Sequence, residues 1–175
     1  KNEYSNAKVI KTYSNEAVIM MSDSAKGVLI RGIDKNKIQE IDLFKNKIID
    51  GKISNFTKGT IVIGKQLAIE LGVVVGDKIN IMSSTSTSTM LGLVPKQSSY
   101  EIISVFSSGL YEFDRNIVFF SIEDSLSFFE KNYDDIAIEI YLKDPLNADK
   151  YKDRIQINNS SLYVSSWADL NKSFL

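Results

Sequence analysis

The sequence predicts an α+β protein, because stretches with strand composition and stretches with helix composition both recur without strict alternation. Residues 51–121 are mostly of strand character, whereas the stretches on either side mix strands with helices. We therefore expect an α/β subdomain built from residues 1–50 and 122–175, with residues 51–121 inserted as a β-rich subdomain. At 175 residues the chain is long enough for one good core or two small ones.

The first part of the chain has the pattern of a strand followed by a hairpin. Val9–Tyr13 has the composition of a short strand. Ala17–Met21 and Val28–Ile33 are further apolar runs, and the turn-rich Asp23–Gly27 between them indicates a hairpin. The Lys-rich residues 34–50 that follow are compatible with one short helix.

The middle of the chain combines strands with one short helix. Residues 51–59 have a loop composition, and the β-branched run Thr60–Ile63 predicts a strand. Lys65–Leu71 is expected to be helical, with Gly72 well placed to end the helix. Further strands are predicted over residues 78–82, 100–106 and 117–120.

The last part of the chain opens on a helix signal. Ser121 can cap a helix over Ile122–Glu130, with Asp124 in the capping-box position. Apolar and other residues then alternate over Ile136–Leu142, which predicts a half-buried strand. The remaining predicted elements are a helix from Asp144-Pro145 to about Arg154, a strand over Leu162–Val164 and a helix from Trp167.

Composition excludes several classes of function. The net charge of −1 argues against a nucleic-acid binder, which needs a basic face. The absence of both cysteine and histidine excludes Ser-His-Asp triads, Cys-His dyads and HExxH zinc sites. No apolar run approaches the ~20 residues that span a bilayer. Because the chain begins without Met and ends on apolar residues, we expect it to be a piece of a longer protein.

The segment Gly59–Gln66 nearly matches the phosphate-binding pattern GxxxxGK[ST], but the match fails on two grounds. Gln66 has no hydroxyl group for magnesium. The four middle residues, Thr60–Ile63, favour a strand, whose N–H groups point to both sides and cannot converge on a phosphate. We therefore predict no nucleotide site and no cofactor.

Several carboxylates are candidates for acid–base or metal-binding groups. Glu112 and Asp114 would share one face of a strand. Their neighbours Tyr111 and Phe113 favour a solvated edge or turn that carries aromatic packing anchors. The acidic pairs Glu123-Asp124 and Asp134-Asp135 fit a helix N-terminus and a strand start, and they lack the alternating oxygen ligands of a calcium loop. We predict no catalytic residue and no metal ligand.

The segment Ser83–Gln97 is the strongest functional candidate. Ser83–Thr89 consists of hydroxyl residues only, and the apolar Met90–Pro95 follows it. A long segment without secondary structure of its own is usually functional or disordered. An apolar tip on a polar stem is expected to be shielded from water, either by a partner or by the domain itself. Two interpretations remain open here: the tip binds a partner, or it folds back onto the domain.

Four blocks of the chain stand out by their order and spacing. They are Gly64–Gly72, Gly76–Ile79, Gly109–Asp114 and Trp167–Phe174. Together they resemble the extracytoplasmic domain of the LolC/LolE family, whose members are membrane subunits of the ABC transporter that releases lipoproteins from the bacterial inner membrane. The first two blocks also resemble, more loosely, the wider group of MacB-type periplasmic domains.

The resemblance implies a MacB-like periplasmic domain with two parts. One is an α/β (porter-like) part from both chain ends, and the other is an inserted β-rich (sabre-like) part, in agreement with the division expected above. It implies a place on the periplasmic face of the inner membrane of a Gram-negative bacterium, in a multi-pass membrane protein, and a domain that is not an enzyme. The implied partners are lipoprotein cargo, a LolA-type periplasmic carrier, a cytoplasmic ATPase subunit and a second membrane subunit.

In LolC-like members a protruding hook loop inserts into the hydrophobic cavity of the carrier. Residues 83–97 occupy the place of this loop. By resemblance we expect carrier binding at Met90, Leu91, Gly92, Leu93, Val94, Pro95 and Gln97. Gly92, Pro95 and Gln97 match the pattern of the hook.

Two departures from the family pattern affect the expected carrier contact. Met90 stands where the family has a proline near the hook tip, and Asn80 and Ser98 stand at basic positions of the adjoining surface. Whether the subunit is LolC-like, LolE-like or serves both roles stays open. One alternative is a MacB- or FtsX-like permease domain that binds another periplasmic partner. The alternative from a different class is a Ser-Lys or carboxylate-dependent hydrolase, although no Ser-x-x-Lys signature marks a site clearly.

Overall fold

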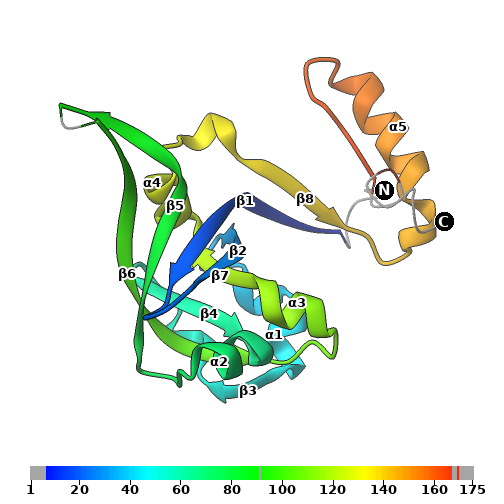
Figure 1. The fold of residues 1–175 in the computed structure, drawn as a ribbon. Coiled ribbons are helices and arrows are strands. Elements are labelled where there is room, and N and C mark those ends of the chain that lie inside the picture. Colours follow the sequence, from blue (N-terminus) through cyan, green and yellow to red (C-terminus); the bar gives the residue numbers. More distant parts are fainter. Residues whose placement is uncertain (1–6, 91, 167–168, 170–175) are drawn as a thin grey trace. The chain divides into compact units, whose positions relative to one another are not determined.

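The computed structural model describes residues 7–90, 92–166 and 169, which form two compact units (Figure 1). The larger unit is Ile10–Glu139, and the smaller unit combines Lys1–Val9 with Ile140–Leu175. The boundaries of these units differ from the predicted boundaries at residues 50/51 and 121/122. The division into porter-like and sabre-like subdomains stays a prediction.

One mixed sheet dominates the described residues. Its strands are β1 Lys8–Met20, β2 Ala25–Ile33, β3 Ile48–Gly51, β4 Thr60–Gly64, β5 Lys78–Thr89, β6 Gly92–Phe106, β7 Ile117–Ser121 and β8 Ala137–Tyr141. The strand order is β2-β7-β4-β6-β5-β1-β8, and β3 pairs with β6. β2 runs parallel to β7 and β4 runs parallel to β6. The pairs β1–β2, β1–β5, β3–β6, β4–β7 and β5–β6 are antiparallel.

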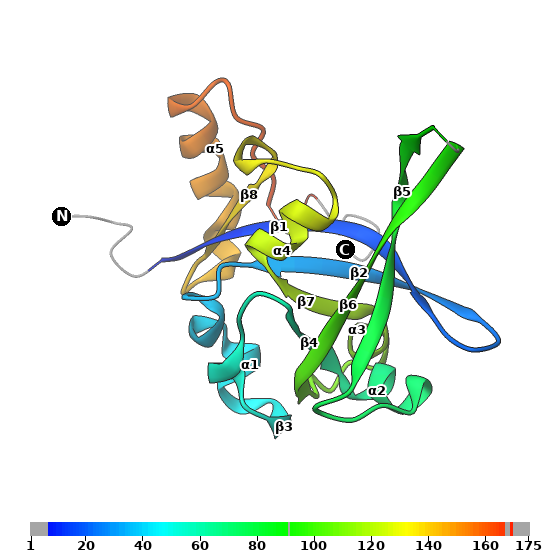
Figure 2. The same cartoon turned by 90° about the vertical axis from the view of Figure 1, so that its left-hand side faces the viewer.

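Six of the strands close into a ring. β1 pairs with β5 on one side and with β2 on the other, so the order β2-β7-β4-β6-β5-β1 returns to its start. Figure 2 shows these strands wrapped around one another, with β5 and β6 extending beyond them. Closure leaves the ring strands without free edges over their paired segments.

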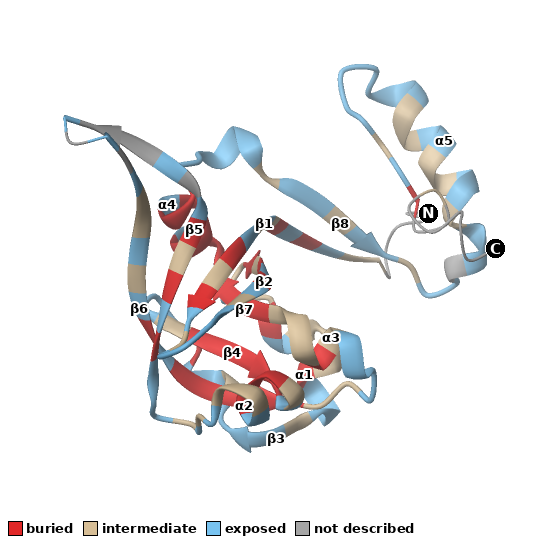
Figure 3. Ribbon diagram, viewed as in Figure 1, coloured by how far each residue is buried: buried red, intermediate tan, exposed pale blue. Residues whose placement is uncertain are grey.

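Two apolar clusters lie on opposite faces of the ring strands. On β7, Val118 and Phe120 belong to one cluster and Phe119 to the other, as the two-residue repeat of a strand requires. The first cluster draws on all six ring strands, so we assign it to the ring interior. Figure 3 shows the buried residues concentrated along these strands.

Short helices complete both clusters. They are α1 Asp42–Asn46, α2 Lys65–Leu71, α3 Tyr111–Asn116 and α4 Ile122–Phe128. Leu67 of α2 and Phe128 of α4 join the interior cluster, whereas Phe44 of α1 joins the outer one. Phe113 of α3 packs against Phe106 and Phe119, with ring centroids 5.9 and 6.5 Å apart, so it is one of the two packing anchors that the sequence predicted. The other, Tyr111, is exposed, so that part of the prediction was wrong.

Local sequence signals predicted several elements correctly. The helix α2 has the predicted bounds, and Gly72 ends it in the left-handed conformation with φ of +66°. The Ser121 hydroxyl accepts a hydrogen bond from the Asp124 amide at 3.1 Å, which caps α4 as expected. The predicted hairpin is the pair of β1 and β2, although β1 is a single strand where two were expected.

Other predictions of local structure were wrong. The segment Ser83–Gln97, expected to have no secondary structure of its own, lies mostly in β5 and β6. Glu112 and Asp114 lie on the helix α3 and not on a strand. Leu162–Val164 forms no strand.

The strand predicted over Ile136–Leu142 exists as β8, but its burial differs from the prediction. Ile138 and Ile140 are exposed, and Glu139 between them is half-buried, where it accepts a hydrogen bond from the Thr12 hydroxyl at 3.3 Å and pairs with Arg31. The alternation therefore predicted the strand and not the buried face.

The smaller unit contains α5 Ala148–Asn158, preceded by a short 3₁₀ turn at Pro145–Asn147. The helix predicted from about Asp144 to Arg154 is thus confirmed, with a later start and end. The block Trp167–Phe174 falls outside the described residues except for Asp169. Among the described residues, no helix combines the length and apolar character needed to cross a membrane.

Candidate functional site: a protruding two-stranded arm

The candidate site is the outer half of the β5–β6 hairpin. β5 pairs with β1 only over Ile81–Ser83, and β6 pairs with β4 from Glu101 onward. Beyond these points, Ser86–Thr89 and Gly92–Pro95 pair with each other. We call residues 84–97 the arm; Figures 1 and 2 show it leaving the ring as a two-stranded ribbon.

Cross-strand pairing explains why a run of hydroxyl residues forms a strand. Threonine favours the extended backbone, and the backbone of Thr87 pairs with that of Val94. Thr89 pairs with Gly92, so only two residues connect the strands. Gly92 has φ of +112°, a backbone conformation that residues with a side chain rarely adopt. Pro95 lacks an N–H group, which a two-stranded ribbon with a free side tolerates.

The structure places the predicted contact residues in two groups. Met90 and Gly92 lie at the tip, with the Met90 side chain fully exposed, and Val94 follows with about half of its surface exposed. Pro95 is half-buried and Gln97 is exposed, nearer to the ring. Leu91 lies outside the described residues, and Leu93 is described by its backbone alone.

Two side chains at the base of the arm were missed by the sequence reasoning. The Ser84 hydroxyl donates a hydrogen bond to the Glu16 carbonyl of β1 at 2.8 Å. The Lys96 ammonium donates to the Ser127 carbonyl of α4 at 2.5 Å. A signal for Lys96 was present, because it is the only charged residue between Lys78 and Glu101.

The surface beside the arm is uncharged at Asn80 and Ser98, the two positions at which the LolC/LolE resemblance led us to expect basic residues. Asn80 is exposed and lies opposite Ser99, and Ser98 is half-buried opposite Ile81. Ser98 also hydrogen-bonds to Tyr100, whose pKa is raised to about 12, chiefly by burial and secondly by the charge of Asp124.

The carboxylates that the sequence singled out have structural roles. Asp114 is buried, and its carboxylate accepts hydrogen bonds from the Ser108 amide at 2.9 Å and the Ser108 hydroxyl at 2.5 Å. It also accepts one from the Ser107 hydroxyl at 3.3 Å. Glu112 is exposed and accepts from the Asn116 side chain at 3.0 Å. The two carboxylates thus bind different groups and do not form an acid–base pair.

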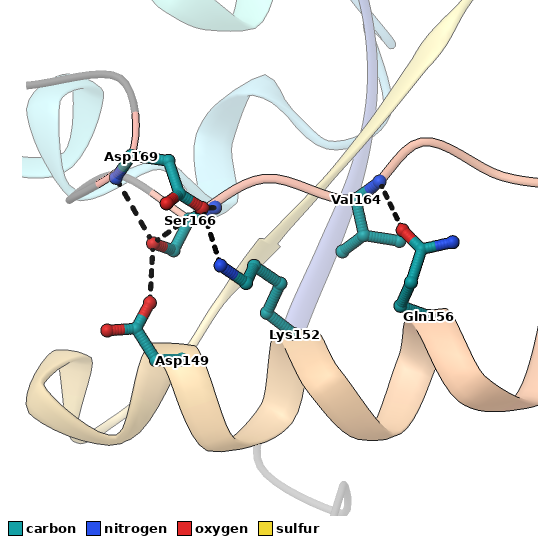
Figure 4. A network of polar contacts seen from close by, with 6 residues as sticks. All are labelled: Asp149, Lys152, Gln156, Val164, Ser166 and Asp169. Carbon is teal, nitrogen blue, oxygen red and sulfur yellow. Dashed lines mark hydrogen bonds and ion pairs between the residues drawn. The ribbon is translucent and has the colours of Figure 1, made fainter.

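The smaller unit contains a serine–lysine–aspartate cluster that bears on the hydrolase alternative (Figure 4). The Ser166 hydroxyl donates to Asp149 at 2.7 Å. The Ser166 amide donates to Asp169 at 3.0 Å, and the Asp169 amide returns a bond to the Ser166 hydroxyl at 3.3 Å, which is the reciprocal pattern of a capping box.

Lys152 in this cluster does not have the lowered pKa that a general base requires. Its ammonium contacts Asp169 at 2.8 Å, and this hydrogen bond raises the pKa of Lys152. A lysine that activates a serine needs a lowered pKa. The cluster therefore fits a helix cap better than a hydrolase. Among the residues with described positions, no group of three or more acidic, His or Cys side chains could hold a metal ion.

Comparison with known proteins places this geometry in context. No family model matches the chain. It is 24% identical over 165 residues to the lipoprotein-releasing system transmembrane protein LolC of Neisseria meningitidis serogroup B, covering 92% of this chain and 40% of that protein. It is 27% identical over 114 residues to the LolC of Xylella fastidiosa, covering 64% of this chain and 28% of that protein. The chain thus spans less than half the length of these curated relatives.

A solved structure supports the fold. The extracellular domain of the noncanonic ABC-type transporter YknZ from Gram-positive bacteria superposes with a TM-score of 0.55 at 15% sequence identity, covering 93% of this chain and 81% of that one. The predicted α+β, MacB-like fold class is therefore confirmed. The resemblance to LolC that the four sequence blocks indicated is confirmed as well.

Proposed function

We propose that this chain, a periplasmic domain of a LolC-type ABC permease, helps to release lipoproteins from the inner membrane and passes them to a periplasmic carrier of the LolA type through its arm. The observation that carries the proposal is the fully exposed Met90 at the tip of a ribbon that stands clear of the ring. An exposed apolar side chain at the end of a polar stem is typical of an anchor that enters a partner's pocket.

The energetics suit a transient contact. Burying Met90 and one further apolar side chain of the tip supplies roughly 3–6 kcal/mol before ordering costs. Because the backbone of the arm is already paired as a hairpin, less order has to be gained on binding than for an unstructured loop. We therefore expect micromolar affinity, which allows the carrier to leave with its cargo.

Replacing Met90 with Asp tests the docking role of the tip. We expect carrier binding, measured by calorimetry, to weaken at least about tenfold, because a carboxylate at the anchor position would have to be desolvated in an apolar cavity. Ile69→Asp is the matched control, because Ile69 is an exposed apolar residue on α2, away from the arm. Met90→Leu should bind nearly as well as the natural sequence. A folded Met90→Asp protein with unchanged affinity would refute the docking role.

In the full-length protein we expect a cytoplasmic ATPase subunit and a second membrane subunit as further partners, because LolC relatives are named as parts of a lipoprotein-releasing system. The alternative, a MacB- or FtsX-like permease that serves another periplasmic partner, draws its support from the fold shared with YknZ. Co-purification of the full-length protein separates the two proposals: recovery of a lipoprotein carrier favours the first, and recovery of a different partner favours the second.

A further inference from the structure

The hydrogen-bond ladder of the hairpin is interrupted where the arm leaves the ring. Met82 pairs with Gln97, and the next pair along the hairpin is Ser86 with Pro95. Residues 83–85 of β5 therefore face Lys96 alone on β6. Such a bulge bends the ribbon and removes ladder hydrogen bonds, so it is the place where the arm would pivot.

Two side-chain hydrogen bonds start within this bulge, one from each strand. Ser84 of β5 bonds to the Glu16 carbonyl of β1, and Lys96 of β6 bonds to the Ser127 carbonyl of α4. The Ser127 carbonyl lies in the last turn of α4, where it also accepts a hydrogen bond from the Glu130 amide at 3.4 Å. A lysine ammonium is favoured at this end of a helix. Each side of the ribbon is thus tied to a different element of the larger unit.

We infer that Ser84 and Lys96 brace the arm at its bulge, and that Lys96 is a positioning residue which fixes the direction in which the tip is presented to the carrier. The inference rests on the proposed function, because a fixed direction matters only if the tip docks. A tip that points in the productive direction only part of the time binds with an affinity reduced by that fraction. The brace therefore acts on binding without touching the partner.

Spin-label distances in the isolated chain test the brace directly. The chain has no native cysteine, so cysteines introduced at Ser86 on the arm and at Lys65 on α2 can be labelled selectively; both positions are exposed. We expect Lys96→Met to broaden the distance distribution, and adding Ser84→Ala to broaden it further. Lys96→Arg should restore the natural distribution, because a guanidinium can donate the same hydrogen bond. Lys58→Met, at an exposed lysine outside the arm, is the control for loss of charge.

Carrier binding provides the second measurement. An exposed bond of this kind shifts a two-state balance by about fivefold at most, so Lys96→Met should lower the affinity by about three- to fivefold, with rescue by Lys96→Arg. Superimposable distance distributions for Lys96→Met and the natural sequence would overturn the brace, whether or not the affinity for the carrier changes. Failure of the natural sequence to bind any carrier would overturn the proposed function, while the distance measurement would still decide the brace.

Discussion

At the scale of single residues, Gly64 lies where two of the four sequence blocks that resemble the LolC family meet in space. These blocks are Gly64–Gly72 and Gly109–Asp114. A Cβ atom at this position would lie 2.0 Å from the Asp114 carbonyl oxygen. Its φ of −77° is open to any residue, so space and not backbone conformation requires glycine here. The absence of a side chain lets the end of β4 lie directly against α3.

We predict that Gly64→Ala destabilises the protein by about 2–4 kcal/mol, because the backbone of Asp114 has to move and its bonds to the Ser107–Ser108 turn are disturbed. Urea unfolding followed by circular dichroism measures the change. Gly27→Ala is the control, since nothing lies within 4 Å of a Cβ atom there. Equal stability of the two variants would show that α3 does not depend on this contact.

At the scale of elements, the sequence predicted those helix bounds and caps that depend on residues nearby in the chain. The bounds of α2 and the cap of α4 follow from residues within a few positions of each helix end. The arm could not be predicted in this way, because a run of serine and threonine has no apolar alternation. Its strand state depends on pairing across the hairpin, which local composition does not reveal.

The candidate site likewise has one part that local sequence predicts and one part that it does not. The apolar tip at Met90 was visible in the sequence, because an apolar cluster after a hydroxyl run is unusual for a surface loop. The brace was not visible, since Ser84 and Lys96 bond to Glu16 and Ser127, which lie 68 and 31 positions away in the chain. Only the fold brings these pairs together.

An ion-pair group links three elements and gives the fold a pH dependence. Glu70 of α2 contacts Arg115 of α3 and also Lys26 of β2, the latter at 3.0 Å. The hydrogen bond from Arg115, followed by that from Lys26, lowers the pKa of Glu70 below its ordinary value of 4.5. A lowered folded-state pKa contributes stability above the unfolded-state value, and this contribution is lost as the pH falls through the folded-state pKa.

We predict that Glu70→Gln is less stable than the natural sequence at pH 7 by about 1 kcal/mol or less, since the pairs are partly exposed. The difference in unfolding free energy should shrink as the pH falls below 4.5, where the natural carboxyl also becomes neutral. Urea titrations over a pH series measure it. Glu101→Gln, at an exposed carboxylate outside this ion-pair group, is the matched control. A difference that stays constant with pH would exclude an electrostatic origin.

At the scale of the whole molecule, ring closure was the least predictable feature. The parallel pairing of β2 with β7 joins residues about ninety positions apart, and no local pattern encodes such pairing. The two apolar clusters that result draw all their buried members from the range between Ile10 and Phe129. The larger unit therefore contains the complete core of the ring.

We predict that a chain shortened to residues 10–139 folds on its own, with a cooperative thermal transition within a few degrees of that of the full chain, because it keeps both clusters and all six ring strands over their paired segments. Circular dichroism during heating measures the transition. A shortened chain without a cooperative transition would show that the smaller unit is needed for the ring to form.

The continuity of β6 has a mechanical consequence. This one strand runs from Gly92 beside the tip to Phe106 in the outer cluster, and its inner half is hydrogen-bonded to both β4 and β3. A force applied along the arm would load these bonds in shear, where they must break together and not one by one. The hairpin can therefore transmit a pushing or pulling force between the ring and a partner bound at its tip.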